Sequence, residues 1–354
     1  MRLGMSLGTA VLGMAVVLGM GVANSVASAA DKYRIIYIAP QQNNAADIVI
    51  AKNWQEVAES LGMEAVIKNA ETDAKREADE WATAIALGYD AIVGGPVDSF
   101  AATISVKKAN AAGIPVFMLG RTSAGGKVEL IARADNFSLG TIAAEELVRR
   151  VTAQRGEAAG KVLELHGPMD QVNARQRSEA IQAVIAKYPK IELIRKVQHW
   201  TPEEFFDITK SVASANDLVG ITMGSDVIPG VDAALDSIGQ LKAIGHPDHI
   251  VLTGIDADPR ILDLMGNDMW DASALQDMVG YGTMLAHYIK DYLDGSFKIT
   301  AAGVIDNPGA PYHGIEARPA PDTEGWEIQT PSRVVDKYNH TDPTLWGNAI
   351  KKYQ

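Results

Sequence analysis

The sequence predicts an α/β protein with two doubly wound parallel sheets. Short apolar segments rich in Ile, Val and Leu alternate along the chain with amphipathic segments of helical length. Nearly continuous apolar strands are typical of strands buried on both faces, as in parallel sheets that helices cover. The strand–helix units fall into two consecutive sets, and the 354 residues are enough for two domains of ordinary size. Right-handed crossovers within each set therefore favour two open sheets over one.

The candidate strands are short and mostly Ile, Val and Leu. The first set lies at 34–40, 64–67, 91–93 and 114–119, and the second at 161–165, 191–194, 218–222 and 250–253. Helices are expected between them at 54–61, 73–87, 98–112, 138–151, 173–187, 203–215 and 280–293. Asp73 and Asp98 stand at helix starts, and Gly88 and Gly113 at helix ends, which are the positions these residue types favour.

The end of the chain has a different pattern. Pro and Gly are frequent from 307 to 330, and apolar periodicity disappears there. This composition predicts a long surface loop, followed by a short strand at 332–335 and a surface tail at 337–354.

The first thirty residues have the pattern of a signal peptide. Arg2 gives a positive start, residues 3–22 are apolar or small, and the small residues at 27–30 precede a polar pair. This order predicts export and cleavage near Ala29 or Ala30. An N-terminal membrane anchor is the alternative for a run of this length. Beyond Val22 no apolar run is long enough to span a bilayer.

Composition excludes several classes of partner and chemistry. The chain has no Cys, so disulfides, thiolate nucleophiles, Cys-ligated metals and a lipid-modified N-terminal Cys are all excluded. The formal net charge is −12. A negative protein is a poor partner for nucleic acid or an anionic membrane. We therefore expect neither of these partners.

Polar side chains gather where the predicted strands end, which is where open parallel sheets bind ligands. These ends are rich in Asn, Asp, Gln and Arg, and one of them carries Trp200. Planar amide, carboxylate and guanidinium groups match the vicinal hydroxyls of neutral polyhydroxylated ligands, and a tryptophan face covers the apolar face of a sugar ring. For Asp98 and Asp226 helix capping is the preferred interpretation. For Arg121 and Arg177 ligand contact is preferred.

Several of these segments occur in a familiar order. They are Asn43-Asn44 before the first helix, Gly120-Arg121, 134–136, 175–177, 224–226, 254–256 and 274–276. Together they resemble the ribose-binding-protein family of periplasmic receptors over Tyr33 to about Phe297. The ending at 331–335 and 342–348 resembles sugar receptors with extended tails.

The resemblance implies a set of ligand-binding residues. The family's contacts fall on Asn44, Arg121, Arg177, Ser225, Asp256 and Gln276, with Trp200 near a ring-stacking position. The sequence departs from the family at Ala46, Asp47, Gly95 and Gly120, which replace two aromatic rings, an Asn and an Asp. Asp47 is placed to supply the missing carboxylate from the opposite wall. The smaller side chains would admit a larger or differently shaped ligand, so we expect a carbohydrate or polyol other than ribose.

The resemblance also implies an architecture and a function. A three-segment hinge near Asp135, Gln276 and Asp306 would join an N-terminal lobe (31–134 and 277–305) to a C-terminal lobe (135–276 and 306–336), with the ligand cleft between them. Closure around a neutral sugar or polyol would present the protein to the membrane permease of an ABC importer in the periplasm. A chemoreceptor or sensor kinase is the alternative partner. We expect a monomer without a cofactor.

Enzyme signatures do not fit. The turn after the first strand, 40–44, has no Gly for a dinucleotide, and the loop from Gly120 to Lys127 has the wrong spacing for a phosphate loop. Beyond the predicted signal peptide, no Gly-x-Ser-x-Gly motif occurs. His246 and His249 have metal-like spacing but no third ligand in view. An export signal stands where a DNA-binding regulator would carry a helix-turn-helix. We therefore expect neither an enzyme nor a metal site.

Overall fold

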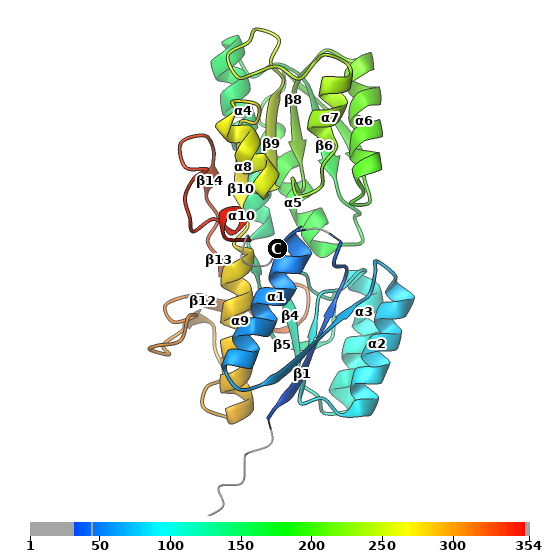
Figure 1. Cartoon of the computed structure of the whole chain (residues 1–354), viewed down its shortest axis with the longest axis vertical. Coiled ribbons are helices and arrows are strands. Elements are labelled where there is room, and N and C mark those ends of the chain that lie inside the picture. Colours follow the sequence, from blue (N-terminus) through cyan, green and yellow to red (C-terminus); the bar gives the residue numbers. More distant parts are fainter. Residues whose placement is uncertain (1–31, 44, 351–354) are drawn as a thin grey trace, which may run out of the picture. The chain divides into compact units, whose positions relative to one another are not determined.

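The computed structural model describes residues 32–43 and 45–350. The signal peptide predicted at 1–30 lies outside the described residues. The described chain contains two sheets whose central strands are parallel and which helices cover, as the sequence predicts. The elements are labelled in Figure 1. No helix in this part of the chain is long and apolar enough to cross a membrane.

The first sheet has the strand order β11-β12-β13-β5-β4-β3-β1-β2. Its strands are β1 (Arg34–Ala39), β2 (Glu64–Asn69), β3 (Ala91–Gly94), β4 (Val116–Leu119), β5 (Lys127–Ala134), β11 (Gly303–Val304), β12 (Glu316–Pro319) and β13 (Glu324–Thr330). Its helices are α1 (Ala45–Ser60), α2 (Ala74–Leu87), α3 (Ser99–Ala111) and α9 (Met278–Asp294). All residues of β3 and β4 are buried, because helices cover both faces of the sheet.

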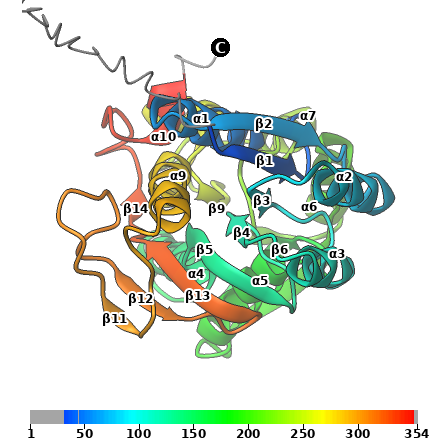
Figure 2. The ribbon, with the colours of Figure 1, turned by 90° about the horizontal axis from the view of Figure 1, so that it is seen from below.

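Local signals set the ends of these helices. The Asp73 carboxylate accepts from the backbone N–H groups of Lys75 and Arg76 at the start of α2, and Gly88 ends that helix with φ 64°. Asp98 caps α3 in the same way, as predicted. Helix α9 packs along α1, so a segment late in the sequence completes the first sheet's cover (Figures 1 and 2).

The second sheet has the order β14-β10-β9-β8-β6-β7. Its strands are β6 (Gly160–His166), β7 (Ile191–Val197), β8 (Leu218–Met223), β9 (Val251–Asp256), β10 (Ala272–Leu275) and β14 (Val334–Val335). Its helices are α4 (Asn136–Arg155), α5 (Val172–Ile185), α6 (Pro202–Ala215), α7 (Val231–Ser237) and α8 (Pro259–Gly266). The central strands β8 and β9 are buried throughout.

Within the described residues the chain passes between the two sheets three times. The first passage, at Asp135, joins β5 to α4, and the second, at Gln276-Asp277, joins β10 to α9. The third joins β13 to β14 at 331–333. Hinge segments were expected near Asp135, Gln276 and Asp306. Among the described residues no passage lies near Asp306, because the segment after it stays with the first sheet.

The segment at 307–330 is not the long loop that its Pro and Gly content predicted. It contains β12 and β13, and β13 pairs in parallel with β5 (Figure 2). The buried Arg133 of β5 donates from Nε to Glu327 Oε2 of β13 at 3.0 Å and forms an ion pair with the same carboxylate at 2.6 Å. This pairing over 194 residues of sequence separation holds the segment on the first sheet. Of the range 306–336, assigned above to the second lobe, β14 alone joins the second sheet.

The expected surface tail at 337–354 is also corrected in its described part. Leu345, Trp346 and Ile350 are buried, with exposed fractions of 0%, 1% and 3%. Trp346 begins the short helix α10 (Trp346–Ala349), which packs against α8. These three apolar side chains explain why the segment is anchored, since burying them offsets the cost of ordering the chain.

Candidate ligand-binding site

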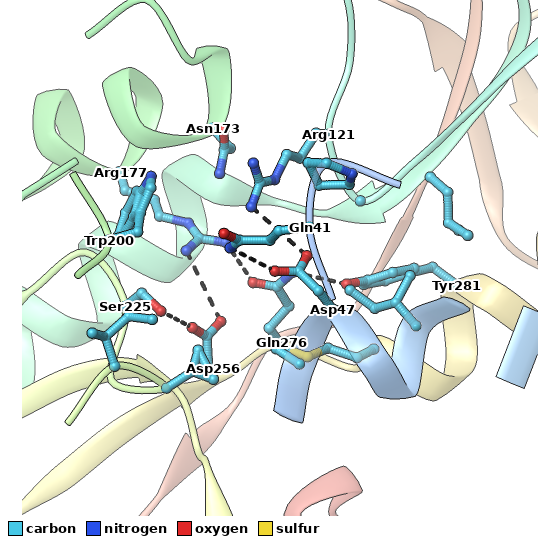
Figure 3. A pocket seen from close by; sticks show the side chains of 18 of the residues that line it. Gln41, Asp47, Arg121, Asn173, Arg177, Trp200, Ser225, Asp256, Gln276 and Tyr281 are labelled. Carbon is cyan, nitrogen blue, oxygen red and sulfur yellow. Dashed lines mark hydrogen bonds and ion pairs between the residues drawn. The ribbon is translucent and has the colours of Figure 1, made fainter. Parts of the chain in front are cut away.

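One pocket lies where strand ends of both sheets converge (Figure 3). It is lined by residues after β1, β4, β7, β8, β9 and β10, together with side chains of α1, α5 and α9. The space open to the centre of a water molecule is about 70 Å³, which corresponds to roughly five waters. The pocket is therefore of a size for a small ligand.

The structure brings together seven of the eight residues that the sequence analysis selected. Those seven line the pocket, and Asn44 lies outside the described residues. The seven are Asp47, Arg121, Arg177, Trp200, Ser225, Asp256 and Gln276. They come from loops and helices spread over 230 residues of sequence, and they meet because the carboxyl ends of the strands face the same space.

Three hydrogen bonds hold the Arg177 guanidinium in place. It donates from Nε to Asn136 Oδ1 at 2.9 Å, from Nη1 to the Gly224 carbonyl at 2.8 Å, and from Nη2 to Gln276 Oε1. Its Nη1 also lies 3.9 Å from Asp256 Oδ1. Arg177 is buried, and burial lowers its pKa from the ordinary value. The result is a rigid cation with one face toward the pocket (Figure 3).

Asp256, at the end of β9, is the partner carboxylate of this cluster. The Ser225 hydroxyl donates to its Oδ2, and its Oδ1 has no hydrogen-bond donor among the described residues. Burial raises the pKa of Asp256 to about 6, although the Arg177 cation and the Ser225 hydroxyl oppose the rise. At neutral pH the carboxylate is ionised and presents a buried acceptor of the kind that a hydroxyl donor satisfies.

A second charged pair stands on the first sheet's side of the pocket. Gln41 donates from Nε2 to Asp47 Oδ2 at 2.8 Å, and Arg121 Nη2 lies 3.7 Å from Asp47 Oδ1. Each sheet thus contributes one arginine and one carboxylate, so the charges balance at neutral pH. A balanced lining with donors and acceptors on both sides suits an uncharged ligand with several hydroxyl groups.

Trp200 is the tryptophan that lines the pocket. Its Nε1 donates to Gln171 Oε1 at 2.8 Å, and its backbone N–H donates to Gln198 Oε1 at 2.6 Å. Its φ of 61° is uncommon for a non-glycine residue. A Cβ on Gly167 would lie 2.0 Å from Trp200 Cζ2, so only glycine lets the ring settle there. These contacts hold the indole in one orientation at the pocket.

Two lining tyrosines were missed by sequence reasoning. Tyr37 and Tyr281 are buried, and burial raises the pKa of both phenols. A Cβ on Gly95 would lie 2.8 Å from the Tyr37 hydroxyl, and a Cβ on Gly120 would lie 3.4 Å from the Tyr281 hydroxyl. The tyrosines therefore take up the space beside these two glycines, and the expectation of a roomier pocket at those positions is wrong. The pairing of each tyrosine with its glycine leaves no local signal in the sequence.

Other lining residues were also not selected from the sequence. Gln41 and Asn173 stand at a strand end and in the first turns of α5, where their type and position were a usable signal. Tyr281 accepts from Gln276 Nε2 at 2.9 Å and so orients that amide. The rest of the lining is mainly apolar: Pro40, Ala46, Ile50, Leu119, Val227, Ile228 and Met278.

Asp226 has a different role from the expected helix cap. Helix α7 begins after Gly230, and Asp226 instead accepts from the Ser273 hydroxyl and, at 3.3 Å, from the Asp258 backbone N–H. It is fully buried, and burial followed by the nearby Asp256 raises its pKa well above the ordinary value. Asp226 is absent from the described lining of the pocket, and its bond to Asp258 holds the loop that follows β9.

The histidine pair with metal-like spacing has structural contacts. His249 is buried, with its ring nitrogens 2.7 Å from the Lys242 carbonyl and 2.8 Å from Asp271 Oδ2. The His246 ring accepts from the Asp248 backbone N–H at 3.1 Å. No group of three or more His, Cys, Asp or Glu side chains suited to a metal ion occurs in the described part of the chain.

The two sheets and the shared pocket define a ligand-binding protein of the two-lobed class. The family described as "Periplasmic binding protein domain" matches residues 35–296, and the chain belongs to this family. The matched range ends at the last helix of the first sheet, so β12, β13 and the tail lie beyond it.

Named relatives share moderate identity over most of their length. The chain is 28% identical over 265 residues to the D-apiose import binding protein of Actinobacillus succinogenes, with 73% of this chain and 81% of that protein covered. It is 27% identical over 256 residues to the ribose import binding protein of Bacillus subtilis, with coverages of 72% and 79%.

A solved structure shows the same fold. The fructose binding periplasmic domain of a hybrid two component system superposes with a TM-score of 0.72 at 20% identity, covering 91% of this chain and 96% of that one. At this identity the likeness establishes the fold.

Proposed function

We propose that the chain is a periplasmic substrate-binding protein that captures a neutral sugar or polyol and delivers it to an ABC import permease. The single observation that carries this proposal is the pairing of Arg177 with Asp256 and of Arg121 with Asp47 on two sides of one pocket. Each pair offers hydrogen-bond donors beside an acceptor, as neighbouring hydroxyl groups require, and the formal charges of the two pairs cancel.

The lining further supports a ring-shaped or compact polyol. The Trp200 indole is held rigidly at the pocket, and apolar side chains such as Ile50 and Met278 stand among the polar groups. An apolar surface beside fixed hydrogen-bonding groups matches the two faces of a sugar. The departures at Ala46, Asp47, Gly95 and Gly120, with the tyrosines beside the two glycines, favour a ligand other than ribose. The names of the relatives, which concern the import of D-apiose and ribose, support the sugar class.

Capture is proposed to work by closure of two lobes, each built on one sheet. The lobes comprise 32–134 with 277–330 and 135–276 with 334–350, joined at the three passages described above. The bonds between them include Gln171 Nε2 to the Val97 carbonyl and the Val172 N–H to Ser99 Oγ, each at 3.3 Å, and, within the pocket, Gln276 Nε2 to the Tyr281 hydroxyl at 2.9 Å. Contacts to a ligand that both lobes share favour the arrangement in which these bonds form.

The location and partners follow from the same proposal. The export pattern at 1–30 and the family support a periplasmic protein released by cleavage near Ala29 or Ala30. The permease would bind the closed form, and the receptor would act as a monomer without catalysis. Sensing is the second candidate, since a fructose binding periplasmic domain of a two component system has the same fold. A chemoreceptor or sensor kinase would then read the same closure.

A thermal-shift screen over pentoses, hexoses and polyols tests the proposal. A ligand that binds only the native state raises the melting temperature, by an amount set by its concentration relative to Kd. We expect one or a few neutral compounds to stabilise the protein and calorimetry to give one site per chain. If no carbohydrate or polyol stabilises it, the sugar-binding proposal is wrong.

A matched pair of variants tests the site. Asp256→Asn removes the pocket carboxylate and is expected to abolish binding of the best ligand. Asp258→Asn is the control, because Asp258 lies two residues away, is also buried and caps α8, yet is absent from the described lining of the pocket. It should keep the affinity of wild type. Equal loss of affinity in both variants would show that the effect is on the loop and not on a ligand contact.

A further inference from the structure

The pocket carboxylate stands on an unusual turn of the backbone. Asp256 has a φ of 115° and Ala257 a φ of 64°, and neither is a glycine. Non-glycine residues adopt such angles at a cost, and they persist only where the surroundings hold them. The direction in which the Asp256 side chain leaves the backbone is therefore set by whatever holds this turn.

Hydrogen bonds to Ser273 of β10 and to Asp226 after β8 fix the residues that follow Asp256. The Ala257 N–H donates to Ser273 Oγ at 2.9 Å, and the Asp258 N–H donates to Asp226 Oδ1 at 3.3 Å. The Ser273 hydroxyl in turn donates to the Asp226 carboxylate. These bonds restrain Ala257 and Asp258 and leave the carbonyl of Asp256 itself to another partner.

That partner comes from the C-terminal tail. Trp346 donates from Nε1 to the Asp256 carbonyl at 2.6 Å, across 90 residues of sequence, and both residues are buried. The tail backbone lies directly on the turn, because a Cβ on Gly347 would be 2.7 Å from the Ala257 carbonyl oxygen. The turn is thus held between the second sheet and the tail.

The tail is itself fixed at several points. Arg333 forms an ion pair with Asp342 at 2.6 Å, and the Asn348 amide donates to the carbonyls of His340 and Asp342, each at 2.8 Å. A segment fastened in this way can hold a backbone carbonyl in one place.

We propose that Trp346 is a positioning residue for ligand binding: from outside the pocket it fixes the backbone of Asp256, and so the aim of the Asp256 carboxylate. Trp346 is absent from the described lining of the pocket, and it lies beyond the range that the family match covers. The inference rests on the proposed function, in which Asp256 contacts the ligand. The C-terminal tail then belongs to the binding machinery of this chain.

The test compares Trp346 with Trp270, which lies just before β10. Trp346→Phe keeps an aromatic ring and removes the N–H that holds Asp256. Trp270→Phe is the matched control, because Trp270 is equally buried and also donates from Nε1 to a backbone carbonyl, that of Ala272, at 3.2 Å, but at a place away from the pocket lining. Both variants should lose thermal stability.

The probes are D-apiose, D-ribose, D-arabinose, D-fructose, myo-inositol and xylitol, titrated calorimetrically into wild type and both variants well below their melting temperatures. For the tightest of these, we expect Trp346→Phe to bind about fivefold more weakly, the factor that corresponds to one neutral hydrogen bond. Trp270→Phe should bind like wild type. Unchanged affinity in Trp346→Phe, or an equal loss in both variants, would overturn the proposal.

Two further measurements keep the outcome decisive. If Trp346→Phe does not fold, Gly347→Ala replaces it, because the added Cβ presses on the Ala257 carbonyl, and it should weaken binding in the same way. If no probe binds the wild type and the thermal-shift screen also finds no ligand, the proposed function is wrong. The positioning role is then decided without ligand, by following the Asp256 carboxyl carbon in an NMR pH titration, with Asp256→Asn to assign the signal. A midpoint that moves in the Trp346 variant and stays in the Trp270 variant supports the role, and identical midpoints refute it.

Discussion

Replacing the pocket carboxylate should make the ligand-free protein more stable. Burial raises the pKa of Asp256 to about 6 from an ordinary value of 3.8. A rise of about two units corresponds to about 3 kcal/mol of cost for the ionised form in the folded protein. Asp256→Asn removes that cost at neutral pH but also loses the attraction to Arg177. We therefore expect the free energy of unfolding at pH 7.5 to rise by about 1–3 kcal/mol, while ligand binding is lost.

The sign of the pH dependence makes this prediction specific. Between pH 3.8 and about 6 the folded protein keeps the Asp256 proton while the unfolded chain has lost it. The carboxylate's contribution to stability is thus complete below the unfolded pKa and is lost as the pH rises through the folded pKa. In urea denaturation at a series of pH values, the advantage of Asp256→Asn over wild type should be large at pH 7.5 and shrink toward pH 4.

An opposite case in the same chain serves as the control. The backbone N–H groups at the start of α2 lower the pKa of Asp73. Asp73→Asn should therefore be less stable than wild type at neutral pH, with the difference shrinking at low pH. If Asp256→Asn is destabilising at pH 7.5, or its effect is the same at every pH, burial does not dominate the energetics of the site.

Three other substitutions test separate parts of the structure. Burial raises the pKa of Glu77 to about 7, so wild-type stability should fall as the pH rises from about 4.5 to 7. Melting temperatures at pH 5 and pH 8 should therefore show that Glu77→Gln becomes more stable relative to wild type at the higher pH. A difference that is the same at both pH values would contradict the burial effect. Arg133→Ala removes the buried cation beside Glu327 and should cost about 3 kcal/mol in urea denaturation; a cost below about 1 kcal/mol would mean that β13 does not depend on this pair. Gly167→Ala places a Cβ 2.0 Å from Trp200 Cζ2, so it should shift the tryptophan emission and weaken sugar binding; an unchanged spectrum would show that the ring is not confined there.

Much of the pocket could be predicted because strand ends are a local feature. Arg121, Ser225 and Asp256 each follow a predicted apolar strand directly, and parallel strands bring such positions to one edge. Arg177 lies on the helix that follows a strand, where the same argument reaches it. The two tyrosines could not be found this way, because each is selected by the space beside a glycine distant in sequence.

Two strands of the first sheet show the limit of local patterns. Strand β5 was missed, although six of its eight residues are buried, since the preceding glycine-rich segment reads as a loop. Strand β13 was not predicted because Pro and Gly are frequent around it. It forms because it pairs with the edge of β5 and because its Glu327 binds the buried Arg133. Strand formation that depends on a distant partner leaves little trace in its own sequence.

The sequence by itself determined the alternation of strands and helices, the two-sheet plan and the polar groups at the strand ends, because apolar periodicity and turn residues act over a few neighbouring positions. Only the tertiary structure decided which sheet receives β12 and β13, how the tyrosines fill the space beside Gly95 and Gly120, and that Trp346 reaches the carbonyl of Asp256. Those outcomes depend on contacts between residues far apart in the chain. Close packing and the need to satisfy buried hydrogen-bonding groups determine which of these residues meet.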